Sequence, residues 1–388
     1  MKKLNYLLPV IVFTCILFGL CVKGITSADK TYSSAEKREL QTRPKMSAEA
    51  IRKGTFQEKY ETYLSDQFPG RDMWVQLQTD ASRLMGKSVS NGVYFGKDDY
   101  LLEHHTDAEF ETKQERKNIK SLVELVKNIA DDYSVHVMLV PTKTWTLQQK
   151  LPFCASTYDE QKMYDSLNEQ LGNLADSVVV PVQETLCSHR EEDIYYRTDH
   201  HWTPLGAFYA YTEFCNAKGI RANNILQYKK KTFKGFKGTF YRDTNNNKTL
   251  RVDNIQTFYP LSGKKISMYY KTVQGQKIHA PLIDNVSRYG ESLKYCAFIS
   301  GDNPLTVIKN KAIKDGSSCV VVKESFGNVF VPYLADHYQN VYVIDYRYWS
   351  GKLSSFVQKK KVQDVILLNN ISMTRNSYLV SKLGGIAG

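Results

Sequence analysis

Residues 319–328, CVVVKESFGN, carry the clearest indication of the fold class. The three valines predict a short strand that is buried on both faces, and Ser325 follows it at a sharp turn. The residues after Ser325 predict a helix. A buried strand that turns directly into a helix is the building unit of a parallel α/β sheet, and such sheets bind ligands at the carboxyl ends of their strands. The stretch therefore predicts an α/β domain with Ser325 at a ligand-binding edge.

The alternation of strands and helices continues on both sides of this stretch. Strands are expected at residues 135–140, 177–182, 320–322, 341–344 and 365–368. Helices are expected at residues 108–131, 159–172, after Thr203-Pro204, at 326–337 and at 353–360. This order predicts a parallel sheet flanked by helices. Residues 92–103 predict a hairpin. Residues 220–290 are basic and strand-like, with a loop at Asn245-Asn246-Asn247, and predict a β-rich insertion.

The chain begins with an apolar segment. Residues 4–22, LNYLLPVIVFTCILFGLCV, carry no charge, and their length approaches the roughly 20 residues that span a bilayer. Lys2 and Lys3 precede the segment, which places the N-terminus in the cytoplasm and the remainder outside. Residues 1–28 are therefore expected to be a membrane anchor, or a signal with Thr26-Ser27-Ala28 as its cleavage site.

Three regions follow from these patterns. The anchor or signal occupies residues 1–28, and residues 29–90 form a tether and helical lead-in. Within the lead-in, residues 29–55 predict an extended tether. Residues 56–87 predict a helical segment that breaks at Phe68-Pro69-Gly70. Residues 91–388 form the main α/β domain.

Composition limits the classes of function. The 388 residues are 42% apolar and 24% charged, which is typical of a globular protein. The formal net charge of +12 fits either an anionic cell envelope or a merely solvated lysine-rich surface. We expect no nucleic-acid partner, because no nucleic-acid motif accompanies the charge. The seven cysteines show no CxxC spacing, which argues against a zinc ribbon. Most of them are expected to be buried free thiols, and if one disulfide forms, it is expected to join Cys154 with Cys187.

Residues 196–204, YRTDHHWTP, hold the first candidate site. Thr203 and Pro204 predict the start of a helix, so the preceding residues lie in a turn. Asp199 and His201 are two residues apart, and in an extended chain both would point to one side. The carboxylate could then orient the imidazole for proton transfer.

A structural role and a metal-binding role for this stretch also stay open. The pair could be an ordinary structural hydrogen bond. Alternatively, Asp199, His200 and His201 could bind a metal ion, with His189 as a further ligand. His200 and His201 are expected to point in opposite directions, which disfavours a shared metal.

Ser325 is the second candidate. The N–H groups that open the next helix could stabilise an oxyanion, Gly327 allows a close backbone approach, and Asn328 offers an amide donor. A lone serine in such a turn is also typical of a helix cap. Arg347 follows the strand at 341–344 and could bind an anionic or polar acceptor, or pair with Asp345 to close a loop.

The tetrad Asp199-His200-His201-Trp202, followed by Glu324–Pro332 (ESFGNVFVP) and Val341–Tyr348, resembles the DHHW family. That family is similar to AlgX/AlgJ-type alginate O-acetyltransferases and to SGNH hydrolases. The resemblance implies an SGNH-like fold in which Ser325 is the nucleophile, His201 the general base and Asp199 its orienting carboxylate. Trp202, His200, Gly327, Asn328 and Arg347 would surround the substrate or the oxyanion. Glu324 stands where many relatives have Asp.

The resemblance also implies a function. It predicts an envelope O-acyltransferase that acetylates a secreted or cell-wall polysaccharide through an acyl-serine intermediate, without a metal or other cofactor. A membrane-bound O-acyltransferase would supply the acyl groups. The protein would be single-pass in the cell membrane with its catalytic domain outside, or secreted if the leader is cleaved. The alternatives are a carbohydrate esterase of the same fold and a non-catalytic, polysaccharide-binding scaffold.

Overall fold

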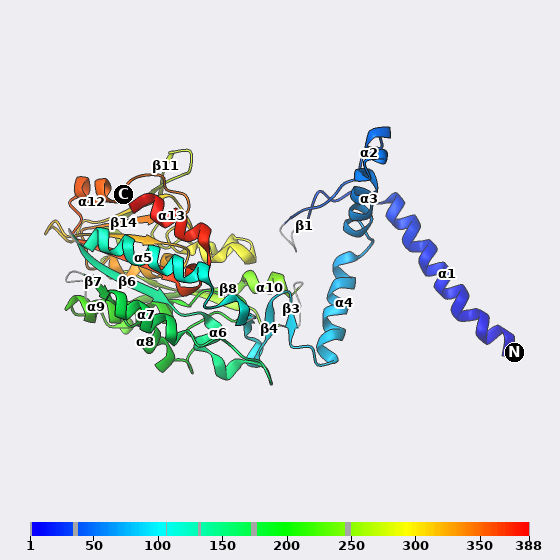
Figure 1. Cartoon of the computed structure of the whole chain (residues 1–388), viewed down its shortest axis with the longest axis horizontal. Coiled ribbons are helices and arrows are strands. Elements are labelled where there is room, and N and C mark those ends of the chain that lie inside the picture. Colours follow the sequence, from blue (N-terminus) through cyan, green and yellow to red (C-terminus); the bar gives the residue numbers. More distant parts are fainter. Residues whose placement is uncertain are drawn as a thin grey trace. The chain divides into compact units, whose positions relative to one another are not determined.

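The computed structural model describes residues 2–33, 38–105, 107–130, 133–171, 177–244 and 250–387 (Figure 1). The chain divides into two compact units. One comprises Met1–Asn91 with Tyr241–Thr249, and the other comprises Gly92–Phe240 with Leu250–Gly388. The predicted loop Asn245-Asn246-Asn247 lies outside the described residues.

The larger unit is built on one eight-stranded sheet in the order β11-β10-β12-β14-β13-β15-β6-β7. Its strands are β6 (Ser134–Val140), β7 (Ser177–Val179), β10 (Ile266–Lys271), β11 (Lys277–Ala280), β12 (Leu305–Asn310), β13 (Ser318–Lys323), β14 (Asn340–Asp345) and β15 (Asp364–Asn370). The strands from β14 to β7 pair in parallel. The pairs β14–β12, β12–β10 and β10–β11 are antiparallel. The predicted α/β sheet is thus confirmed, with an antiparallel extension at one edge.

Helices cover both faces of this sheet. The helices of the larger unit are α5 (Lys113–Ala130), α6 (Lys143–Thr146), α7 (Gln161–Leu171), α8 (Val182–Ser188), α9 (Pro204–Lys218), α11 (Gly327–Leu334), α12 (Leu353–Lys360) and α13 (Ser377–Ala387). α10 (Thr239–Asp243) begins in the larger unit and ends in the smaller one. Val320 and Val322 of β13 pack in one apolar cluster with residues of α5, α7, α12 and α13. On the opposite face, His136 of β6 meets Phe214 of α9. Burial on both sides explains the unbroken valine run of β13.

The predicted insertion is β-rich, but it is not a separate body. β8 (Lys229–Phe236) and β9 (Asp253–Tyr259) form their own antiparallel pair. β10 and β11 instead join the main sheet, because β10 pairs with β12 along its whole length. The expected strand at 177–182 is shorter than predicted and is followed by α8. The hairpin at 92–103 is confirmed by β4 (Val93–Phe95) and β5 (Leu101–Glu103).

The smaller unit contains the apolar leader as α1 (Lys2–Thr26). Within the described residues, one helix is long and apolar enough to cross a membrane, and its span Leu7–Thr26 has a mean hydropathy of 2.3. The unit also holds β1 (Tyr32–Ser33), β2 (Arg38–Glu39), α2 (Ala48–Arg52), α3 (Thr55–Asp66), α4 (Arg71–Leu84) and β3 (Val89–Ser90). The predicted break at Phe68-Pro69-Gly70 is confirmed by the end of α3 and the start of α4.

The described part of the segment after the leader, which the sequence predicts as an extended tether, is hydrogen-bonded within its own unit. β1 and β2 pair antiparallel, and the segment is bound to the end of α3. Gln67 accepts the backbone N–H of Lys30 at 2.9 Å and donates to the carbonyl of Gln41 at 3.0 Å. Asp66 accepts the Gln41 N–H at 2.8 Å. The polar and basic composition predicts a solvated segment, whereas Asp66 of α3 and Gln67, which follows α3, bind part of its backbone.

The predicted disulfide is wrong. Cys154 and Cys187 are not joined to each other, and no cysteine among the described residues forms a disulfide. Cys154 is exposed in a loop, whereas Cys187 lies in α8 and packs against the apolar core. Cys215 and Cys319 are fully buried and behave as small apolar residues.

Candidate active site

Asp199 and His201 lie in a closed loop directly before α9. Tyr195 and Trp202 form an antiparallel bridge at its base, and Tyr196 donates its N–H to the His201 carbonyl at 3.2 Å. Asp199 Oδ1 accepts the His201 backbone N–H at 3.0 Å and lies 2.5 Å from His201 Nδ1. The two side chains therefore meet as expected, but a tight loop brings them together and not an extended strand.

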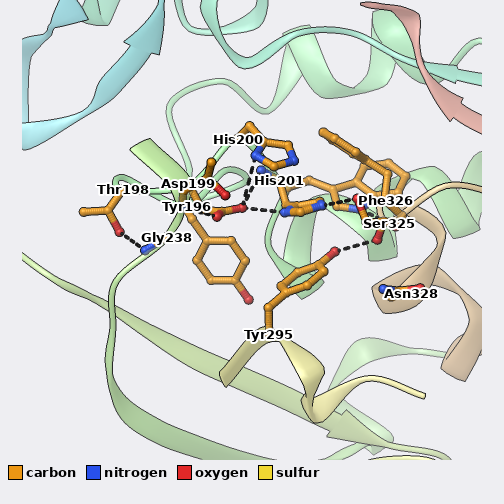
Figure 2. A network of polar contacts seen from close by, with 12 residues as sticks. Tyr196, Thr198, Asp199, His200, His201, Gly238, Tyr295, Ser325, Phe326 and Asn328 are labelled. Carbon is orange, nitrogen blue, oxygen red and sulfur yellow. Dashed lines mark hydrogen bonds and ion pairs between the residues drawn. The ribbon is translucent and has the colours of Figure 1, made fainter. Parts of the chain in front are cut away.

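Ser325 completes a line of polar contacts. It lies in the turn between β13 and α11, and its Oγ is 2.7 Å from His201 Nε2 (Figure 2). Because Asp199 accepts the proton on Nδ1, Nε2 is left as an acceptor for the serine hydroxyl. A hydroxyl and a base within hydrogen-bond reach, with the base oriented by a third group, is the arrangement of nucleophilic catalysis. The loop and the turn are 124 residues apart in sequence.

Trp202 and Gly327 hold the turn that carries Ser325 in place. Trp202 is fully buried, and its Nε1 donates to the carbonyl of Phe326 at 3.0 Å, which ties the loop to the serine turn. A Cβ on Gly327 would lie 2.6 Å from Lys323 Cβ, so glycine lets α11 start close against β13. Because Trp202 is fully buried, it positions the turn and does not reach a substrate.

His200 lies beside His201 and not opposite to it. The two ring centroids are 3.9 Å apart, so the expectation that the rings point in opposite directions is wrong. Burial and the neighbouring His201 ring lower the pKa of His200. Its side chain is 29% exposed, which leaves it facing the surface of the site.

A metal ion has one candidate position among the described residues. Ligand atoms of Asp199, His200 and His201 lie within 4.8 Å of one another. However, Asp199 Oδ1 and His201 Nδ1 are already hydrogen-bonded to each other. His189 contacts Glu192 and does not belong to this group. The arrangement therefore favours proton transfer over metal binding.

Asn328 and Arg347 belong to a partly buried ionic network at the ends of β13 and β14, in which Lys323 and Asp345 are buried and Asp302 is exposed. Asn328 Nδ2 donates to Asp302 Oδ1 at 2.9 Å. Arg347 binds Asp345 through Nε at 2.8 Å and through a terminal nitrogen at 2.7 Å, and it lies 2.9 Å from Asp302. Lys323 pairs with the same two carboxylates. The structure thus shows the loop-closing pair of Arg347 with Asp345 that the sequence left open.

Lys143 is a site residue that the sequence did not reveal. It opens α6, after β6, and is completely buried. Its Nζ donates to three carbonyls of the histidine loop, those of Tyr196, Arg197 and Asp199, at 2.7 to 3.2 Å. Burial lowers the pKa of Lys143 to about 8. A single lysine in a polar segment carries no local signal of this role.

The insertion supplies further partners to the loop. Asp253 on β9 accepts the Thr198 N–H at 2.7 Å and its hydroxyl at 2.6 Å. Thr239 donates its N–H to Asp199 Oδ2 at 2.8 Å. Burial alone would raise the pKa of Asp199, but the His201 and His200 rings and the hydrogen bonds from His201 hold it well below its usual range. Asp199 is therefore a carboxylate at neutral pH.

Tyr295 is another residue of the site that the sequence did not indicate. Its ring stacks on His201 with centroids 4.1 Å apart, and its hydroxyl donates to the Ser325 carbonyl at 3.1 Å (Figure 2). It lies in a short 3-10 helix, Glu291–Ala297. One residue thus contacts both the imidazole and the serine turn.

A mostly parallel sheet with this Asp–His–Ser arrangement at its carboxyl edge defines the class, an SGNH-like α/β fold. The chain belongs to the DHHW protein family, whose model matches residues 118–344. The matched range contains the tetrad Asp199–Trp202 and Ser325.

Solved structures of other proteins share this fold. A DHHW family protein from Eubacterium siraeum has a solved structure that superposes with a TM-score of 0.64 at 23% identity, over 76% of this chain and 95% of that one. The structure of Bacillus cereus PatB1 superposes with a TM-score of 0.59 at 22% identity, over 73% of this chain and 97% of that one. At this identity the two structures establish the shared fold alone.

One sequence relative carries a functional name. It is described as probable alginate O-acetylase AlgJ of Pseudomonas syringae pv. tomato, and it is 25% identical over 163 residues. The match covers 40% of this chain and 40% of the relative, so it spans less than half of that protein.

Proposed function

We propose that this protein is an O-acyltransferase of the cell envelope that acetylates hydroxyl groups of a secreted or cell-wall polysaccharide. The observation that carries the proposal is the contact of Ser325 Oγ with His201 Nε2, with Asp199 on the other ring nitrogen. The name of the AlgJ relative supports acetyl transfer as the chemistry. The three residues act as nucleophile, general base and orienting carboxylate.

The reaction proceeds in two half-reactions. Ser325 Oγ attacks the carbonyl carbon of the acyl donor while His201 Nε2 takes its proton. His201 then protonates the departing group of the donor, which leaves an acyl-serine. An acceptor hydroxyl attacks this ester, its proton passes to His201, and His201 returns the proton to Ser325 Oγ as the acylated product leaves. Asp199 stabilises the imidazolium in each half-reaction.

The surroundings of Ser325 suggest which group holds the oxyanion. The N–H groups of Gly327 and Asn328 already donate to carbonyls within the turn, those of Glu324 and Ser325. The Asn328 side-chain amide uses one N–H for Asp302 and has a second. We assign the oxyanion contact to this second N–H. His200 borders the acceptor side, because its ring is partly exposed beside His201.

The location and partners form part of the same proposal. The helix α1 would anchor the protein in the cell membrane with the larger unit outside the cell. A membrane-bound O-acyltransferase would deliver the acyl group, and the polysaccharide would be the acceptor. If water replaces the acceptor hydroxyl, the same site is an esterase.

The first test is hydrolysis of a small acetyl ester by the full chain in detergent. We expect Ser325→Ala to lower the rate of acetate release about a thousandfold or more, because the nucleophile is lost. Exposed Ser287→Ala is the matched control and should behave as wild type. Equal activity of Ser325→Ala and wild type would contradict a serine mechanism.

Adding oligosaccharide acceptors separates transfer from hydrolysis. A transferase should release less acetate and form acetylated oligosaccharide as the acceptor concentration rises. An esterase should form no such product. A folded wild-type protein that acts on neither substrate would favour the scaffold alternative.

A further inference from the structure

Glu324 precedes Ser325 and contacts its hydroxyl. Glu324 Oε2 lies 3.0 Å from Ser325 Oγ and accepts the N–H of Phe326 at 3.3 Å. Glu324 Oε1 accepts the N–H of Asn370, at the end of β15, at 3.0 Å. His201 Nε2 lies 2.7 Å from the same Oγ. The serine oxygen is therefore held between a base and a carboxyl group, and the mechanism above uses only the base.

The contacts of Ser325 Oγ with His201 and with Glu324 conflict when Glu324 is ionised, because there is one proton for two acceptors. The Ser325 hydroxyl has a single proton to donate, and His201 Nε2 is an acceptor. An ionised Glu324 can only accept, so it competes with His201 for that proton. A protonated Glu324 brings its own O–H and can donate it to Oγ, which leaves the serine proton for His201. While His201 Nε2 is the acceptor, as its role of general base requires, only the protonated carboxyl satisfies both contacts at once.

The surroundings of Glu324 favour the neutral form. Its exposed fraction is 8%, and burial raises the pKa of its carboxyl group. Four neighbours oppose this effect on the pKa without reversing it: the charge of Arg347, the N–H of Asn370, His200 and the hydroxyl of Ser325. Arg347 is already paired with two carboxylates, which weakens its opposition. The phenols of Tyr295 and Tyr346 also face Glu324, and His201 lies on the far side of Ser325 Oγ.

We propose that Glu324 is a further catalytic residue, which donates a hydrogen bond to Ser325 Oγ when protonated and withholds the serine proton from His201 when ionised. The inference rests on the proposed function, because it concerns the same nucleophile. No proton is consumed: in acylation the serine proton moves to His201, and Glu324 keeps its own. In deacylation Oγ is the leaving atom, and the Glu324 O–H stabilises the charge that develops on it until His201 returns the proton.

The proposal predicts a specific pH dependence. The neutral form of Glu324 is the active one, so activity is present below its pKa and is lost as the pH rises through it. For wild type, kcat/KM on a small acetyl ester should fall about tenfold per pH unit on the alkaline side. Glu324→Gln keeps an N–H donor at the same position and cannot ionise. Its kcat/KM should stay level, within about twofold, over the same range.

The experiment compares wild type, Glu324→Gln, Glu324→Asp and Ser325→Ala as full chains in detergent, across pH. Two rates are measured, ester hydrolysis and labelling by an arylsulfonyl fluoride that reacts with activated serines. Thermal melting establishes that each variant is folded. If Glu324→Gln does not fold, Glu324→Asp carries the test. The shorter side chain of Asp moves the carboxyl group away from Ser325 Oγ. The pH at which kcat/KM falls should therefore differ between Glu324→Asp and wild type.

The outcomes separate the two proposals. The role of Glu324 is overturned if kcat/KM of Glu324→Gln, or of Glu324→Asp, falls at the same alkaline pH as that of wild type. The fall would then belong to another group, such as Lys143. In that case, an inert Ser325→Ala leaves the proposed function intact. If Ser325→Ala hydrolyses the ester and is labelled as fast as wild type, the serine mechanism fails and the role of Glu324 fails with it.

Discussion

Asp199 is held in place by a glycine on a different segment. A Cβ on Gly238 would lie 2.2 Å from Asp199 Cβ and 2.5 Å from Asp199 Oδ2. Gly238 also donates its N–H to Thr198 Oγ1 at 3.1 Å. The backbone at Gly238 therefore passes so close to the aspartate that no side chain fits between them. A close approach of this kind is a reason for glycine that local sequence does not display.

Gly238→Ala should accordingly misplace Asp199 and, through it, His201. We expect kcat to fall about a hundredfold, since a displacement of about 1 Å in such a site has an effect of that size. Stability should fall by about 1–3 kcal/mol from overpacking. Ester hydrolysis and thermal unfolding measure the two effects.

Gly290→Ala is the matched control. Gly290 has open space where a Cβ would be added, and its φ is −55°. It should retain wild-type activity and stability. A fully active Gly238→Ala would show that Asp199 does not need its present position.

At the level of elements, a buried carboxyl group joins the turn after β6 to the start of α7. Glu160 accepts the Thr142 N–H at 3.0 Å and the Thr142 hydroxyl at 2.6 Å. Burial raises the pKa of Glu160 to about 7 from its ordinary value of 4.5, against the effect of these hydrogen bonds. The turn that this contact fixes also carries Lys143, which holds the histidine loop.

The stability of the protein should therefore depend on the ionisation of Glu160. A carboxyl whose pKa is higher in the folded state binds its proton preferentially there. Its contribution is present below pH 4.5 and is lost as the pH rises to about 7. The free energy of unfolding should fall by about 3 kcal/mol across this interval from this group. In Glu160→Gln that part of the fall should be absent, as measured by denaturant unfolding.

Glu169→Gln is the control for this prediction, because Glu169 is exposed on the same helix, α7. It should show the wild-type pH dependence. An unchanged pH dependence in Glu160→Gln would mean that Glu160 is ionised in the folded protein throughout this interval.

The sequence best predicts the helices and strands whose apolar residues follow a clear pattern. The strand β13 and the helices α5, α9 and α12 follow from apolar runs, an apolar stripe and the Thr203-Pro204 start signal. The sequence predicts the strands β10 and β11 as part of a β-rich insertion or subdomain. Their place in the main sheet depends on pairing with β12, and such long-range pairing leaves no local pattern.

At the scale of the whole molecule, the leader and the segment after it form one unit. A Cβ on Gly24 would lie 3.6 Å from Pro69 Cγ, so the end of α1 packs against the turn between α3 and α4. This packing favours a leader that is kept as an anchor.

We expect the mature protein to retain its leader. Mass spectrometry of the purified protein should find peptides from residues before Lys23, and the protein should stay with membranes after a carbonate wash. A mature N-terminus at residues 27–29, with the protein in the soluble fraction, would show cleavage instead. A variant without residues 1–28 is the control and should leave the membrane fraction.

The sequence by itself determined the fold class, the family resemblance and the residues of the candidate triad, because these depend on local periods and short motifs. Tertiary structure decided how those residues meet. It closed the loop that joins Asp199 to His201, and it placed Lys143 under that loop. It also set Glu324 against the serine hydroxyl. The contact of His201 with Ser325 joins segments 124 residues apart, and the contacts of Lys143 join segments more than 50 residues apart. Such contacts come from packing and strand pairing, which the pattern of any one segment does not encode.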